Sequence, residues 1–153
     1  IQDGGSSTGQ ENDWGCHGTS ISTGTAIGTG QQNTLNIIAA CPGSEMILDL
    51  ANTNAGYGPQ DWFIPSKDEM YEAMDKIGYD PLNQGNFGLS EYMWTSSEVN
   101  STNAWTLKDG PTGTTGAYPI QQISMSKSQT LGNGPTITGN NFGRLKFIRA
   151  FQN

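Results

Sequence analysis

Apolar residues recur with helical spacing most clearly in the segment DWFIPSKDEMYEAMDKIG, residues 61–78. They fall at positions i, i+3, i+4 and i+7, which form one face of a helix: Met70, Ala73, Met74 and Ile77. Ser66 followed three residues later by Glu69 is a capping box, and Gly78 is suited to end the helix. Acidic residues are stabilising in a first turn, so we interpret the carboxylates of this segment as a helix start rather than as a catalytic acid pair.

Two shorter helices are predicted ahead of this one. Asn33 or Thr34 is suited to cap the first, and the dipeptide Pro42–Gly43 to end it. Its apolar members lie mostly on one side: Leu35, Ile37, Ile38, Ala39 and Cys41. Ser44 is the expected cap of the second, whose inward-facing residues would be Met46, Ile47, Leu50 and Ala51.

Alternating and β-prone residues predict strands in the second half of the chain. The expected strands are YMWTSSE (92–98), NAWTLKDG (103–110), QQISMSK (121–127) and GRLKFIRAF (143–151), with a tight turn at GNG (132–134). Residues 1–30 are rich in glycine, serine and threonine, which is typical of loops with a short strand. Helices followed by strands indicate an α+β fold.

Length and charge narrow the class of protein. The 153 residues fit a single domain spanning residues 1–153. Fourteen acidic and seven basic residues give a net charge of −7, and no run of lysine or arginine could follow a phosphate backbone, so nucleic acid is not an expected partner. No stretch approaches the ~20 apolar residues that a membrane-spanning helix needs, so membrane insertion is not expected either.

The two cysteines, Cys16 and Cys41, show no C-x-x-C spacing. The residues favour a disulfide over two reduced thiols, and a disulfide would indicate an oxidising compartment.

The motifs of common catalytic and metal sites do not occur in the sequence. His17 is the only histidine available as a base, and there is no G-x-S-x-G motif. Outside the helix, a glycosidase pair would have to come from Glu91, Glu98 and Asp109. Loop oxygens could gather around calcium, but there is no D-x-D-x-D-G loop. We therefore expect no enzymatic activity and no cofactor.

Several motifs in this order resemble one protein family: DWGC, GTAIGTGQQNT, DWFIPSKDEM, YMWTSSE and the closing FIRAF. The combination resembles the Lcl-type C-terminal domain of bacterial collagen-like adhesins, which is related to the Fibrobacter major paralogous domain. The resemblance implies a C-type-lectin-like fold, with short helices on a twisted antiparallel sheet and a long irregular loop region. It also implies that Cys16 pairs with Cys41, and that the strand from Trp94 to Glu98 and the side chain of Trp105 belong to the core.

The sequence departs from this family in two ways. The family has a hydrophobic strand ahead of the segment that begins here at Ile1, so the chain is expected to lack its first strand, as in a fragment, a processed form or a domain completed by another subunit. The Glu-Pro-Asn and Trp-Asn-Asp signatures of animal lectins do not occur, which argues against calcium-dependent sugar binding.

From the resemblance we predict an extracellular or cell-surface adhesion module that binds glycans or another extracellular polymer through its loop face. Aromatic rings stack on sugar rings while amides and carboxylates bond the hydroxyls, and the residues expected to do so are Asp109, Tyr118, Gln121, Gln122, Asn140 and Asn141. A sulfated glycan would instead be held by cations, namely Lys127, Arg144, Lys146 and Arg149. The alternative is a structural subunit of a surface appendage or filament, in which a neighbouring subunit or a second copy of the chain pairs with an open sheet edge.

Overall fold

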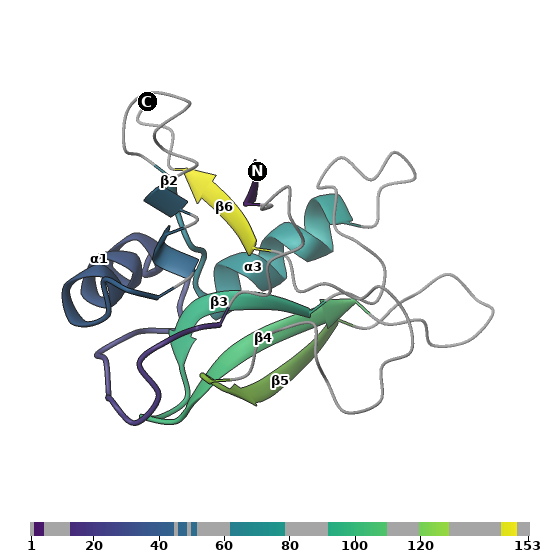
Figure 1. Cartoon of the computed structure of the whole chain (residues 1–153). Coiled ribbons are helices and arrows are strands. Elements are labelled where there is room, and N and C mark those ends of the chain that lie inside the picture. Colours follow the sequence, from purple (N-terminus) through teal and green to yellow (C-terminus); the bar gives the residue numbers. More distant parts are fainter. Residues whose placement is uncertain are drawn as a thin grey trace.

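The structure is a computed structural model of the 153-residue chain, and it describes residues 2–4, 13–44, 46–48, 50–51, 62–78, 92–109, 120–128 and 145–149 (Figure 1). For residues 2–4, 77–78, 109, 145–146 and 149, only the backbone is described. Short helices and antiparallel strands make up these parts, which confirms the predicted α+β class.

The helices are α1 (Gly30–Ala40), α3 (Lys67–Ala73) and a π-helical turn, η1 (Met74–Gly78), that continues α3. Residues 46–48, 50 and 51 are also helical. The strands are β1 (Gln2–Gly4), β2 (Trp62–Phe63), β3 (Tyr92–Glu98), β4 (Asn103–Asp109), β5 (Ile120–Ser126) and β6 (Leu145–Arg149). The bounds of β3 agree with the sequence prediction, and those of the other long strands agree within a few residues.

Within the described residues, the strands form two antiparallel sheets, ordered β1-β6-β2 and β3-β4-β5. In the larger sheet, β4 and β5 form an unbroken ladder from Asn103↔Ser126 to Asp109↔Ile120. The pairing of β3 with β4 shifts register between Trp94 and Glu98. In the smaller sheet, β6 pairs with β1 on one side and β2 on the other.

Apolar clusters cover both faces of the larger sheet. On one face, Met70 and Met74 from the α3 segment pack on Met93 and Leu107. The opposite face carries Trp94 and belongs to the larger core cluster, which also includes Trp14, Ile37, Ile64 and Phe147. The side chains on both faces of β3 are therefore mostly buried. The helix α3 lies across one side of the sheet, and α1 lies near one end (Figure 1).

The first helix begins earlier than the sequence predicts. Thr29 is the N-cap of α1, so Asn33 and Thr34 lie inside the helix rather than at its start. Their side chains are used in tertiary contacts: Asn33 Oδ1 accepts a hydrogen bond from Gly24 N at 2.8 Å, and Thr34 Oγ1 accepts one from Ile64 N at 3.0 Å. These polar groups hold neighbouring loops against the buried face of the helix. The apolar residues expected on one side are not all buried, since Ile37 is fully buried but Leu35 is 53% exposed.

The second predicted helix is present, but among the described residues the Ser44 side chain accepts no hydrogen bond from its first turn. The Ser44 carbonyl oxygen accepts hydrogen bonds from Ile47 N and Leu48 N, while its hydroxyl donates to Trp14 O at 3.0 Å. Ala51 is exposed rather than inward.

The capping box of α3 is confirmed. Ser66 Oγ accepts a hydrogen bond from Glu69 N at 3.3 Å, and Glu69 Oε2 accepts one from Ser66 N at 2.7 Å. Ser66 also donates to Ala26 O, and Glu69 Oε1 accepts from Gly28 N. The box therefore fixes the loop before α1 as well as the start of α3.

Candidate ligand-binding surface

Glu98, at the end of β3, holds the loop of residues 13–23 against the larger sheet. Its carboxylate accepts hydrogen bonds from Ile21 N at 2.9 Å, from Ser20 Oγ at 3.1 Å and from Lys127 Nζ at 2.6 Å. The backbone N–H of Glu98 in turn donates to Thr23 Oγ1. This carboxylate, one of the three glycosidase candidates, is thus engaged in contacts that hold the fold together.

Lys127 lies in the protein interior, directly after β5. Its side chain is 0% exposed. Its ammonium donates hydrogen bonds to the Glu98 carboxylate and to Thr19 O, and it lies 4.4 Å from the centroid of the Trp14 ring. A buried ammonium with these partners is not presented to a ligand. The structure therefore removes Lys127 from the residues predicted to bind a sulfated glycan.

A disulfide joins Cys16 and Cys41, as both the residues and the family resemblance indicated, with the Cα atoms 5.8 Å apart. It connects the loop of residues 13–23 to the end of α1. His17, next to Cys16, is exposed. A disulfide is consistent with an oxidising, extracellular setting.

The predicted binding residues Gln121 and Gln122 are both exposed on β5, but the structure does not place them together. Successive residues of a strand point to opposite faces of a sheet. Gln122 pairs with Leu107 on the face that carries α3, whereas Gln121 pairs with Lys108 on the face of the larger core cluster. A single ligand on one sheet face would contact only one of them.

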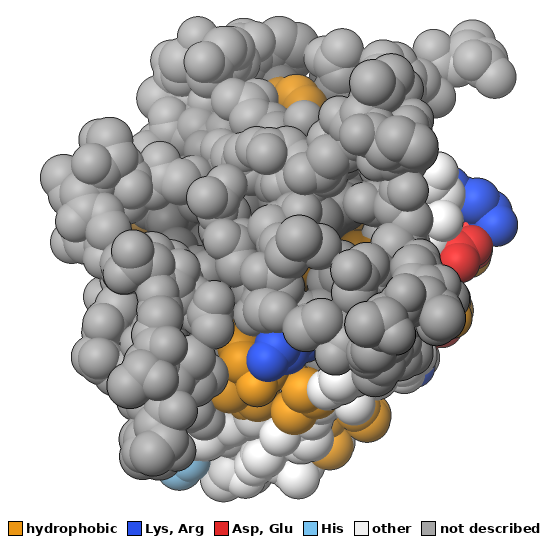
Figure 2. Space-filling model, turned by 90° about the vertical axis from the view of Figure 1, so that its right-hand side faces the viewer, with side chains coloured by type: hydrophobic (Ala, Val, Ile, Leu, Met, Phe, Trp, Pro, Cys, Tyr) orange, Lys and Arg blue, Asp and Glu red, His pale blue; other side chains and the backbone are white. Residues whose placement is uncertain are grey.

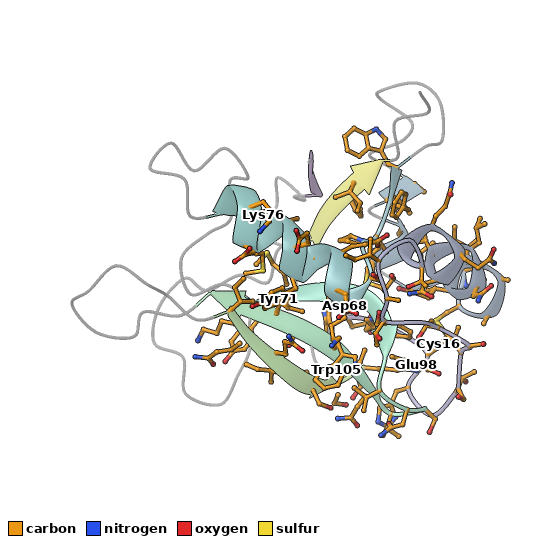
Figure 3. All side chains as sticks on the ribbon, turned by 180° about the vertical axis from the view of Figure 1, so that it is seen from behind. Cys16, Asp68, Tyr71, Lys76, Glu98 and Trp105 are labelled. Atoms are coloured by element: carbon orange, nitrogen blue, oxygen red, sulfur yellow. A yellow bond between two sulfur atoms is a disulfide. The ribbon has the colours of Figure 1, made fainter. Side chains whose placement is uncertain are left out.

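Gln122 belongs to a polar and aromatic group between α3 and the β4–β5 ladder. Lys67 Nζ donates to Gln122 Oε1 at 3.1 Å, lies 3.1 Å from Asp68 Oδ1 and is 5.4 Å from the centroid of the Trp105 ring. Trp105 is half-buried, and Asp68 is partly exposed. We call Lys67, Asp68, Trp105 and Gln122 the Trp105 cluster, and Figure 3 shows Asp68 and Trp105 from behind.

The Trp105 cluster was not predicted from the sequence, where Trp105 was expected in the core. Trp105 and Leu107 are two residues apart on β4, so they lie on the same strand face, and this face carries α3. Leu107 is covered by the α3 methionines, but Trp105 lies nearer the start of α3, where Lys67 rather than an apolar residue approaches it. The sequence signal was alternation, which fixes a shared face but not how much of it is covered.

The remaining predicted binding residues lie where side chains are not described. Tyr118, Asn140, Asn141 and Arg144 are outside the described residues, as are Glu91 and the predicted turn at 132–134. Asp109 ends β4, and Lys146 and Arg149 lie in β6, each with backbone only. Their role in ligand binding therefore stays a prediction.

Charged side chains on the described surface occur as pairs or small groups. On the face shown in Figure 2, hydrophobic side chains gather near the lower edge around a basic side chain, and basic and acidic side chains meet at the right-hand rim. Lys76 on η1 forms such a pair with Asp75. The hydrogen bond from its ammonium to the Asp75 carboxylate raises the pKa of Lys76 above the ordinary value.

Two further observations concern metals and membranes. Across the described ranges, no three His, Cys, Asp or Glu side chains gather in a way that could hold a metal ion. None of the helices in the described parts of the chain is long and apolar enough to cross a membrane.

Comparison of the chain with family models, curated proteins and solved structures yields no match. The resemblance to the Lcl-type domain therefore stays a prediction.

Proposed function

We propose that this chain is a non-enzymatic, extracellular adhesion module that recognises glycans or another surface polymer. The proposal includes the C-type-lectin-like variant of the α+β fold and the relationship to Lcl-type domains that the sequence motifs indicate. Its partners would be a polymer outside the cell or on a cell surface.

The observation that carries the proposal is the solvent-facing side of β5. Gln122 and Ser124 are exposed on the face of this strand that carries α3, and the unbroken β4–β5 ladder holds them in place. Amides and hydroxyls on a rigid backbone can donate and accept hydrogen bonds with sugar hydroxyls at little entropic cost. The half-buried Trp105 adds an aromatic surface beside them.

Two other features support a binding role outside the cell. The Cys16–Cys41 disulfide fits an oxidising compartment. Glu98, one of the three candidates for a glycosidase pair, bonds with Lys127 and with the loop of residues 13–23. Both features suit a rigid module that presents a surface.

The test is binding of the purified, disulfide-bonded chain to a glycan array, with calcium or EDTA and at low and high salt. We expect selective binding that EDTA does not abolish. Salt sensitivity would indicate a sulfated ligand, because screening weakens charge pairs between exposed groups. A chemically reduced and denatured sample is the control, and a blank array from the folded chain would refute the proposal.

A second function, assembly into a filament or appendage, is favoured by the edge of β5. Within the described residues β5 pairs only with β4, and its sequence IQQISMS contains no charge or proline. Edge strands that do not pair with another chain usually carry charged residues or proline. Light scattering coupled to size-exclusion chromatography should then show growth with concentration, and a monomer at high concentration would exclude this function.

A further inference from the structure

The Trp105 cluster combines an aromatic ring with hydrogen-bonding groups whose positions are fixed by one another. We propose that it is the saccharide-binding site of the module and that it takes an uncharged sugar. This inference rests on the proposed function and adds to it a location and a ligand class.

Trp105 has a polar group that the described residues leave unused. Its ring is half-buried between β4 and α3, and its indole N–H has no hydrogen-bond acceptor in the described parts of the chain. By contrast, the buried Trp14 donates its indole N–H to Thr95 O at 2.8 Å. A partly exposed indole can stack on the apolar side of a sugar ring and donate to a hydroxyl group.

Lys67 positions the neighbouring groups. An ammonium can only donate, so the atom of Gln122 that faces it at 3.1 Å is the amide oxygen, and the amide NH₂ group is left to donate elsewhere. Asp68 Oδ1 faces the same ammonium at 3.1 Å, which leaves the other carboxylate oxygen available as an acceptor. The Lys67 side chain is only 18% exposed, so this arrangement is supported by its surroundings.

Charge selects the class of sugar. The positive charge of Lys67 is already balanced by Asp68, and it also faces the electron-rich ring of Trp105. An acidic or sulfated sugar would have to displace Asp68 or lie beside its carboxylate. An uncharged sugar needs only the donors of Trp105 and Gln122 and the acceptor of Asp68.

Tyr71 extends the surface along α3. It lies four residues after Lys67, on the same side of the helix, and is 38% exposed. Figure 3 shows Tyr71 and Asp68 on α3, and Trp105 on the strand beneath, on the side of the molecule turned to the viewer. An oligosaccharide longer than one unit could therefore follow the helix.

The test is a ¹H–¹⁵N titration of the full chain that follows the indole N–H signals. The Trp105 signal is identified as the one lost in Trp105→Phe. The probes are neutral hexasaccharides of β-1,4-linked glucose, mannose and xylose and of α-1,4-linked glucose, with a heparin-derived hexasaccharide for comparison. At millimolar concentration, we expect at least one neutral probe to shift the Trp105 signal and the heparin-derived probe to leave it in place.

Variants then locate the contacts. For the neutral probe with the largest shift, Gln122→Ala and Trp105→Phe should each raise Kd by about tenfold, the upper range for one lost hydrogen bond. Gln31→Ala on α1 and Trp62→Phe on β2 are matched substitutions at an exposed glutamine and a half-buried tryptophan, and they should leave Kd unchanged. Trp105→Phe keeps an aromatic ring, so its fold can be verified from the unchanged signals of the other tryptophans.

The inference and the proposed function fail in different ways. A positive glycan array with an unmoved Trp105 signal would keep the function and overturn this site. A shift caused only by the heparin-derived probe, or equal losses in the matched variants, would also overturn it. A blank array together with a shifted Trp105 signal would retain the saccharide site and refute the adhesion function.

Discussion

Replacing Lys127 by methionine should lower the free energy of unfolding more than replacing any other lysine among the described residues. The side chain of Lys127 is 0% exposed and that of its partner Glu98 is 10% exposed, with 2.6 Å between Nζ and Oε2. Methionine keeps most of the unbranched stem but removes the charge. The substitution leaves a carboxylate buried without its cation, and Thr19 O without its donor.

The cost follows from the burial of the pair. Removing one partner of a buried ion pair costs about 3–5 kcal/mol, because the remaining charge stays out of water. Glu98 keeps the hydrogen bonds from Ile21 N and Ser20 Oγ, which compensate part of its charge. We therefore expect the lower end, about 3 kcal/mol, which corresponds to a loss of roughly 6–12 °C in Tm for a domain of this size.

The assay is urea unfolding followed by tryptophan fluorescence, with the free energy of unfolding obtained by linear extrapolation. The matched control is Lys76→Met, because Lys76 also faces carboxylates but its side chain is 64% exposed. It should show no measurable change. The double variant Lys127→Met, Glu98→Gln should be more stable than Lys127→Met alone, since the unpaired charge is gone. A Lys127→Met chain as stable as the Lys76→Met chain would show that the buried ion pair does not stabilise the fold.

Three further substitutions test other parts of the fold. Replacing Cys16 and Cys41 by serine should lower the free energy of unfolding by about 3 kcal/mol, as for a loop closed over a separation of 25 residues, and an equal Tm in reducing and oxidising buffer would contradict this. Gly30→Ala should cost about 1–3 kcal/mol, because the new Cβ would meet the capping-box carboxylate and lie 2.8 Å from Ser66 N. Gly43→Ala, with nothing within 4 Å of its added Cβ, is the control, and equal denaturation midpoints would disprove the clash. Ser66→Ala should cost about 1 kcal/mol through the lost cap, measured by the same unfolding curves, and an unchanged midpoint would show that the cap is not needed.

Elements whose signals are local can be predicted from the sequence. The capping box of Ser66 and Glu69 involves residues three apart, so the start of α3 is fixed wherever the helix packs. The same holds for β3, where β-prone residues run from Tyr92 to Glu98. Alternation also placed Trp105 and Leu107 on one face of the sheet. The α+β class follows from such local signals.

Which side chains are exposed and which hold the fold together depends on the tertiary structure. Lys127 and Glu98 are 29 residues apart, and nothing local in the sequence shows that one neutralises the other in the interior. Gln121 and Gln122 are neighbours in the chain, but strand geometry places them on opposite faces of the sheet. Trp105 is half-buried rather than part of the core because α3 brings Lys67, not an apolar side chain, to its ring, although the two residues are distant in the chain. Burial and charge compensation depend on contacts between distant segments, and a linear pattern does not contain them.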